Sequence, residues 1–140
     1  MKTRRPRPSR SACPLNAFLE TLGDKWTLLI VRDLLLNRRT SYKDFLAGGE
    51  RVATNILADR LRLLVAAGIV TVHGDSADAR KRVYRLTAKG LDLAPAMVEM
   101  ILWGEKHYEC VLPAETLRWV SRDREGFLAR LRRSHERAGA

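Results

Sequence analysis

The run TNILADRLRLLVAAGIV, residues 54–70, joins a helical pattern directly to a β-branched segment. Leucines recur on one side at about 100° per residue, which predicts an amphipathic helix over roughly 53–67. These leucines are Leu57, Leu61 and Leu64. Gly68 suits the position just after a helix end, and residues 69–73 are β-branched enough to form a strand. The run therefore predicts a mainly α chain with a small β structure.

Three helical patterns precede this run, over residues 14–22, 25–36 and 41–47. The glycine pair after the third pattern breaks it, and a turn of a few residues leads into the 53–67 helix. A helix, a short glycine-containing turn and a second helix form a helix-turn-helix. In that arrangement the N-terminal residues of the second helix enter a major groove of DNA.

A second β-type run, residues 82–86, follows the polar segment GDSADARK and predicts a hairpin with a charged tip. A long helix fits residues 88–109, and Pro95 should kink or divide it because proline removes an amide donor. The apolar residues of this helix extend nearly all round, so we expect burial against a second subunit. A last helical segment begins at Pro113, with Gly126 as its weak point.

These elements predict a fold that is mainly α with a small β-hairpin wing (α+β), a dimeric winged helix-turn-helix. At 140 residues the chain is large enough for one such domain. We expect a basic disordered tail at 1–12 and a C-terminal helical extension at 111–140. The winged helix-turn-helix domain, with dimerisation helices before it and after the wing, is expected at 13–110.

Positive charge is concentrated in particular parts of the chain, whose formal net charge is +10. Residues 1–10 carry five positive and no negative charges, and residues 51–90 carry eight positive against three negative. A basic surplus around the second helix of a helix-turn-helix favours a nucleic-acid partner. Basic tails by themselves are usually solvated and unstructured, so the tail carries less weight.

Several classes of protein are disfavoured by the sequence. No apolar run approaches the ~18 residues of a membrane span, so we expect a cytoplasmic protein without membrane contact. The two cysteines form no CxxC pair and the histidines form no ligand cluster, so we expect no metal and no cofactor. Nothing resembles a nucleophile elbow, a phosphate-binding loop or an HExxH site, so the chain is not expected to be an enzyme.

Four runs of the sequence resemble the HxlR-type family of bacterial transcriptional regulators over about residues 13–107. They are CPLNAFLETLGDKWTLLIVRDL, ADRLRLLVAAGIV, YRLTAKG and LWGEKH. The resemblance implies a homodimer that binds a pseudo-palindromic operator, with recognition helices in successive major grooves and wings at the flanking backbone or minor groove. It also implies dimerisation through the N-terminal helix and the helix after the wing. Together with the apolar pattern, this places these residues at the interface: Leu15, Phe18, Leu19, Met97, Val98, Ile101, Leu102 and Trp103.

Two positions depart from the family pattern. Family members often carry a serine cap where this chain has Ala53, so the recognition helix must begin otherwise, and the Thr54 hydroxyl is one candidate. The wing tip is short and places Asp75 and Asp78 beside its basic run, which leaves its reach toward DNA open.

The polar face of the 53–67 helix supplies the candidate base contacts. They are Thr54, Asn55, Ala58, Asp59 and Arg62. Asn suits adenine, Arg suits guanine, Asp accepts from cytosine, and small apolar groups meet the thymine methyl. The alternative is that Asp59 and Arg62 pair with each other on a solvated face. Arg60 lies at the edge of the leucine stripe and is expected to be a structural ion-pair partner.

Basic residues around the turn and in the wing are the candidate phosphate contacts. They are Arg38, Arg39, Lys43, Arg51, Arg80, Lys81 and Arg82. The alternative for each is a charge that only keeps the surface soluble.

Cys13 precedes Pro14 at a helix N-terminus and is close in sequence to Arg10. The helix dipole and nearby cations favour the reactive thiolate, which makes Cys13 a candidate sensing residue. The family resemblance implies the same role, since relatives carry a cysteine there that responds to quinones, aldehydes or oxidants. The alternative is an inert thiol at a cap position. Cys110 is either a resolving partner across subunits or, as we expect, a buried structural thiol.

We therefore expect a sequence-specific transcriptional regulator, a repressor, whose partners are double-stranded DNA and a second copy of the chain. An electrophile, an oxidant or a small-molecule effector would switch it. One alternative is a non-specific nucleic-acid-binding architectural protein that contacts phosphates only. Another is a protein-interaction module that has the fold but does not bind DNA.

Overall fold

The computed structural model describes residues 10–78 and 80–139. Most of the expected basic tail, residues 1–9, therefore lies outside the described residues. The elements in chain order are α1 (Pro14–Leu22), α2 (Lys25–Leu36), α3 (Tyr42–Leu46), α4 (Thr54–Ala66), β1 (Val70–Gly74), β2 (Arg82–Leu86), α5 (Ala88–Leu91), α6 (Ala94–His107), α7 (Ala114–Arg122) and α8 (Arg124–Gly139). The predicted mainly α fold with a two-stranded wing is confirmed.

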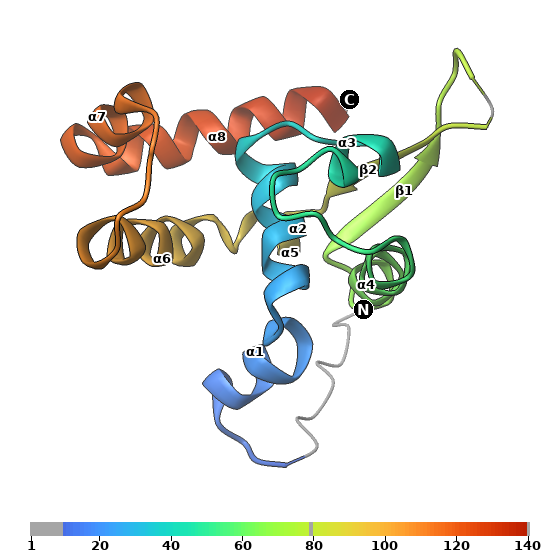
Figure 1. Cartoon of the computed structure of the whole chain (residues 1–140), viewed down its shortest axis with the longest axis horizontal. Helices are drawn as coiled ribbons and strands as arrows, with labels where there is room; N and C mark the ends of the chain where they lie inside the picture. The colour runs from blue at the N-terminus through green and yellow to red at the C-terminus, as the bar shows by residue number, and fades with distance from the viewer. Residues whose placement is uncertain (1–9, 79, 140) are drawn as a thin grey trace.

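Helix α2 stands at the centre of the molecule (Figure 1). Helix α4 and the β1–β2 hairpin lie on one side of it, α6 and α7 lie on the other, and α8 runs across one end. The core consists mainly of leucine, isoleucine and valine side chains from α2, α4 and β1, with Val31 and Leu57 fully buried. This arrangement leaves the outer face of α4 and the hairpin tip at the surface.

Local capping explains where the central helices begin. The Asp24 carboxylate accepts a hydrogen bond from the Thr27 amide (3.0 Å) and so caps α2. Ser41 and Asp44 form a reciprocal capping box at the start of α3. Such caps stabilise a helix by about 1 kcal/mol each.

Helix α4 begins without any side-chain cap from the described residues, because Ala53 has no hydroxyl and Thr54 makes no capping bond. The Tyr42 hydroxyl instead donates to the carbonyl oxygen of Thr54 at 2.8 Å. The suggestion that the Thr54 hydroxyl holds this helix start is therefore wrong. The first turn of α4 is tied to α3 by a tyrosine.

The hairpin is fixed at its base by contacts with the helical part. Strands β1 and β2 pair antiparallel with Val70 opposite Leu86, and the Tyr84 amide donates to the Thr40 carbonyl oxygen at 2.8 Å. Gly90 of α5 lies so close to the segment between α4 and β1 that a Cβ there would come within 2.4 Å of the Ile69 carbonyl oxygen. These contacts therefore fix the orientation of the wing relative to the helices.

Proline divides the predicted 88–109 helix, as expected. Residues 88–91 form α5, and α6 begins at Ala94 with Pro95 in its first turn, where the missing amide has no helical partner to lose. The expectation for the last segment was wrong in detail. Its helix breaks at Asp123, which caps α8 by accepting from the Gly126 amide at 2.9 Å.

Helix α8 packs back against the winged helix domain. Leu128 and Leu131 lie on the core, and a ring nitrogen of His135 lies 2.9 Å from the Leu35 carbonyl oxygen at the end of α2. None of the described helices is both long and apolar enough to cross a membrane.

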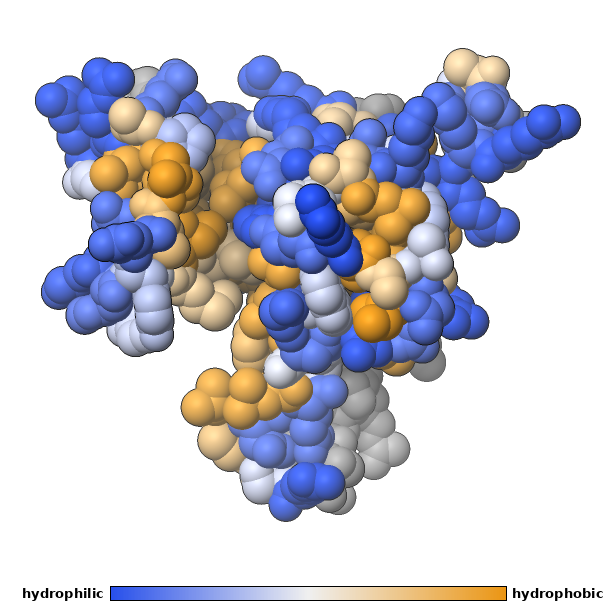
Figure 2. Space-filling model, in the orientation of Figure 1, coloured by the Kyte–Doolittle hydropathy of each residue, from blue (hydrophilic) through white to orange (hydrophobic). Residues whose placement is uncertain are grey.

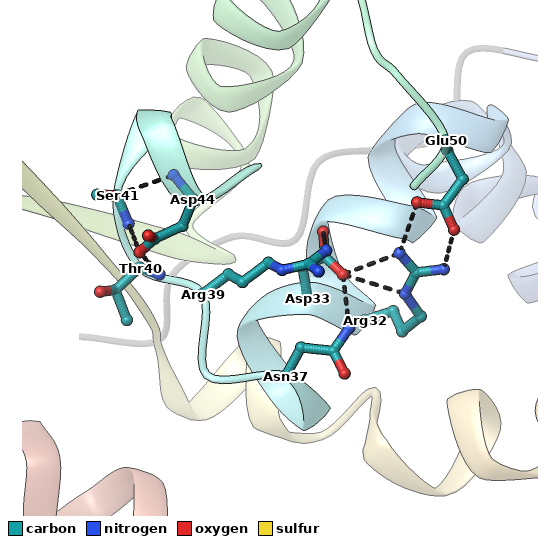
Figure 3. Close-up of polar contacts among 8 residues, drawn as sticks. All are labelled: Arg32, Asp33, Asn37, Arg39, Thr40, Ser41, Asp44 and Glu50. Carbon is teal, nitrogen blue, oxygen red and sulfur yellow. Dashed lines mark hydrogen bonds and ion pairs between the residues drawn. The ribbon is translucent and has the colours of Figure 1, made fainter. Parts of the chain in front are cut away.

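A buried carboxylate connects the end of α2 to its surroundings (Figure 3). Asp33, only 5% exposed, accepts hydrogen bonds from Arg32 (2.8 Å), Asn37 (2.8 Å) and Arg39 (3.1 Å). Arg32 also binds Glu50 with two nitrogens, at 2.6 and 3.1 Å. Since Glu50 lies in the turn before α4, this network holds the turn against α2.

Replacing Asp33 tests the importance of this network. The Asp33→Ala substitution leaves two arginines and an amide without their shared acceptor, so we expect a loss of about 2–3 kcal/mol in unfolding free energy. Urea denaturation followed by circular dichroism measures it. Asp92→Ala is the matched control, since Asp92 forms an exposed ion pair with Arg132 and should cost less than about 0.5 kcal/mol. Equal losses in the two variants would contradict the central role of Asp33.

Candidate nucleic-acid interface

Helix α4 has a buried face and an exposed face, as its sequence predicts. Leu57, Leu61 and Leu64 are buried, which fixes the rotation of the helix. Of the candidate base contacts, Thr54, Asn55 and Arg62 are exposed, whereas Ala58 and Asp59 are half-buried. The most accessible of these side chains lie in the first three turns of the helix.

Arg60 is a structural ion-pair partner, as expected. Its guanidinium donates to Asp24 at 3.0 Å and also pairs with Asp59. Burial works against ionisation of Asp24, but hydrogen bonds from Thr27 and Arg60 outweigh it and hold the pKa of this carboxyl below its ordinary value. Arg60 thereby fastens α4 to the start of α2.

The same pairing changes the role of Asp59. Its carboxylate lies against Arg60 and is also 3.8 Å from Arg62. An acid that already faces two arginines is poorly suited to accept a hydrogen bond from cytosine. Arg62 itself keeps a 78% exposed side chain and is accessible to a groove.

The candidate phosphate contacts around the turn fall into two groups. Lys43 and Arg51 are exposed, and Arg51 adopts a left-handed backbone conformation (φ 55°) between α3 and α4. Arg39 instead binds buried Asp33 at 3.1 Å with a side chain only 30% exposed, so its role is structural. Arg38 is exposed and donates to the Ser134 hydroxyl of α8.

The wing presents all three of its candidate residues, Arg80, Lys81 and Arg82, at the surface. The two aspartates of the tip accept hydrogen bonds from backbone amides, Asp75 from Ala77 (2.8 Å) and Asp78 from Arg80 (3.0 Å). These acids shape the turn, and the basic side chains remain exposed beside them.

Arg32, Asp33 and Glu50 are missing from the sequence-based prediction, although they position the turn before α4. Hydrogen bonds from Arg32 hold the pKa of Glu50 below its ordinary value, against opposing burial. Asp33 and Asn37 are four residues apart, a spacing that places two side chains on one face of a helix. That spacing alone could have indicated part of the network.

Apolar surface remains exposed on α1 and α6, where the dimer interface is predicted. The exposed large side chains there are Leu15, Leu19, Met100 and Trp103. Phe18, Ile101 and Leu102 are half-buried. Met97 and Val98, however, are buried within the same chain, so their assignment to the interface is wrong. The physical reason is that the core and the C-terminal helices cover that side of α6.

Both cysteines are free and exposed. Cys13 occupies the N-cap position of α1, as predicted. The expectation that Cys110 is buried is wrong, since its exposed side chain borders a groove of about 610 Å³. Apolar residues of α6 and α8, including Ile101 and Leu131, line part of this groove. Figure 2 shows hydrophobic surface in a hollow between the part of the molecule formed by α6 and α7 and the part formed by α2.

Among the described residues, no three His, Cys, Asp or Glu side chains gather as metal ligands. What the geometry assembles is a helix with an exposed polar face, a basic wing beside it and a network of ion pairs behind it. That arrangement suits binding to DNA through a groove and its flanking phosphates.

Known proteins are similar to this chain in sequence. The model of the HxlR-like helix-turn-helix family matches residues 21–111. Rv3095 of Mycobacterium tuberculosis, described as an uncharacterised HTH-type transcriptional regulator, is 36% identical over 89 residues. These residues are 64% of this chain and 55% of that protein, so the chain spans about half the length of the curated relative it matches.

Solved structures agree with this assignment. The structure of PA1607 has a TM-score of 0.66 at 34% identity, covering 75% of this chain and 72% of that one. The redox regulator HypR in its oxidised form has a TM-score of 0.62 at 26% identity, covering 70% of this chain and all of that one. The family match runs from the end of α1 to beyond α6 and is supported by sequence and fold alike. The chain therefore belongs to the HxlR-like helix-turn-helix family.

Proposed function

We propose that the chain is a sequence-specific transcriptional regulator, a repressor, that binds a pseudo-palindromic operator as a homodimer. The observation that carries this proposal is the exposed face of α4, with Asn55 and Arg62 accessible while three buried leucines fix the helix. Asn and Arg make two-pronged hydrogen bonds to adenine and guanine. The regulators among its relatives support the same function.

The phosphate contacts in this proposal come from Lys43, Arg51 and the wing residues Arg80, Lys81 and Arg82. All five are exposed on the described surface. Such contacts position a protein on DNA without selecting a sequence. The proposal therefore distinguishes residues that select a base sequence from residues that contact only phosphates, and one binding assay can tell the two apart.

Removing the base contacts tests the proposal. The protein is titrated by fluorescence anisotropy against a duplex selected from random sequences by the wild-type protein, and against its scrambled version. We expect Asn55→Ala with Arg62→Ala to abolish a preference that is about 10³ in the wild type. The control, Lys81→Ala with Arg82→Ala, should weaken binding to both duplexes and reduce the salt dependence. If the Asn55/Arg62 variant still preferred the selected duplex over the scrambled one, α4 would not be the element that reads the base sequence.

The alternative of a non-specific architectural protein rests on the basic charge of the chain. Such a protein would bind the selected and scrambled duplexes equally, with a steep dependence on salt. The same titration of the wild type therefore decides between the two functions.

The homodimer is proposed to form through the exposed apolar residues of α1 and α6. Trp103→Glu places a charge on the α6 part of that surface, where Trp103 is 59% exposed, so we expect it to yield monomer in light scattering. Val111→Glu is the control, because Val111 is 98% exposed and lies outside the proposed interface. Dimers that persist in the Trp103 variant would move the interface elsewhere.

Cys13 is the proposed sensing residue. Support comes from its exposed thiol at the N-cap of α1, next to the proposed interface, and from the similarity to a protein described as a redox regulator. A modified thiol there would change how α1 packs between subunits. The groove beside Cys110 is a second place where a small effector could bind.

Thiol modification tests the sensing role. Treatment with a quinone should reduce affinity for the selected duplex on the order of tenfold, a usual size for coupling between sites. Cys13→Ser should retain full affinity after treatment, and Cys110→Ser should respond like the wild type. A response that persists without Cys13 would refute the assignment.

A further inference from the structure

We propose that one edge of α8 is an additional DNA-contacting surface, which binds the phosphate backbone outside the part covered by α4 and the wing. This inference rests on the proposed DNA-binding function. It gives the C-terminal extension a role beyond covering apolar core, because the charges of α8 are distributed unequally around the helix.

The uneven charge follows from the positions of the charged residues around Ser134, which faces Arg38. At about 100° per residue, Arg137 lies about 60° from Ser134 and Arg133 about 100°. Glu125 lies about 180° from Ser134 and Glu136 about 160°, so both point away from the Ser134 side. The edge of α8 beside Arg38 is therefore positive.

Ion pairs inside the chain use other arginines of the helix. Arg132 binds Asp92 at 2.8 Å, and Arg124 pairs with Glu99 of α6. Arg133 and Arg137 are exposed, and neither has an ion-pair partner among residues 10–78 and 80–139. Two exposed arginines without a carboxylate partner are suited to an anion outside the chain.

The positive edge lies next to the helix-turn-helix. Arg38, which contacts Ser134, is four residues before Tyr42, whose hydroxyl binds the first turn of α4. Four residues of chain span at most about 14 Å. Helix α8 also contacts β2, and in Figure 1 its C-terminal end lies on the side of the molecule that carries this strand. Arg38, Arg133 and Arg137 together form what we call the α8 basic edge.

Regularly spaced negative charge is the partner that this edge fits. A duplex held by α4 continues beyond the half-site with one phosphate charge per about 1.7 Å of its axis. The arginine fork matches phosphate geometry, and each such contact releases counterions. The α8 basic edge would therefore strengthen binding to long DNA without adding sequence preference.

The test compares duplexes of two lengths. One spans only the two selected half-sites, about 20 bp, and the other extends a further helical turn, about 10 bp, at each end. Salt dependence of affinity is measured for the wild type, for Arg133→Glu/Arg137→Glu, and for Arg133→Gln/Arg137→Gln. The control is Arg118→Glu/Arg122→Glu, the same charge change on exposed residues of α7.

On the long duplex we expect the α8 variants to lose up to about 0.9 per arginine from the slope of log K against log salt. On the short duplex their slope should match the wild type. The α7 control should match the wild type on both. Circular dichroism checks that the variants are folded, and the glutamine variant retains helix-forming residues should the glutamates disturb α8.

Equal slopes for wild type and α8 variants on the long duplex would overturn the inference, as would the same loss in the α7 control. In either case a preference of the wild type for the selected duplex would leave the proposed function intact. If the wild type shows no such preference, the proposed function fails and this inference fails with it.

Discussion

The contact between Arg32 and the two carboxylates of Asp33 and Glu50 is the interaction on which the presentation of α4 depends. The leucines of α4 fix how that helix rotates against α2, but they do not fix the turn that leads into it. Glu50 lies in that turn and is bound by two nitrogens of Arg32, which is itself bound to buried Asp33. A buried carboxylate with several donors is costly to disturb. These contacts therefore hold the turn before α4 in a single conformation against α2.

Apolar spacing was sufficient to predict the helices from α1 to α4, the wing and their order, because a repeat of 3.6 or 2 residues is a property of the chain itself. It did not predict the break at Asp123 that separates α7 from α8. The ion-pair network could not be predicted in the same way. Arg32 and Glu50 are eighteen residues apart, and a long flexible arginine meets whichever acid the fold brings near it. Arg39 was assigned to phosphate for this reason, although the fold places it on Asp33.

The candidate interfaces could be predicted only in part, and the reason is again physical. The exposed positions of α4 followed from its leucine stripe, since the face opposite a buried stripe must be outside. On α6 the same reasoning was ambiguous, because apolar residues surround the helix. Val98 could face a partner subunit or another part of the chain, and only the path of α7 and α8 assigns it to the latter. Sequence periodicity identifies buried faces but not what buries them.

The contact between His135 and the Leu35 carbonyl oxygen joins residues one hundred positions apart. During synthesis, apolar residues of α2 that α8 later covers would already have left the ribosome while α8 was still being made. Until α8 is complete, the winged helix core would therefore expose part of its apolar surface to solvent. Exposed surface of this kind makes incomplete chains prone to aggregation, and contacts distant in sequence slow folding. Premature termination before α8 would thus yield a chain that chaperones and proteases recognise.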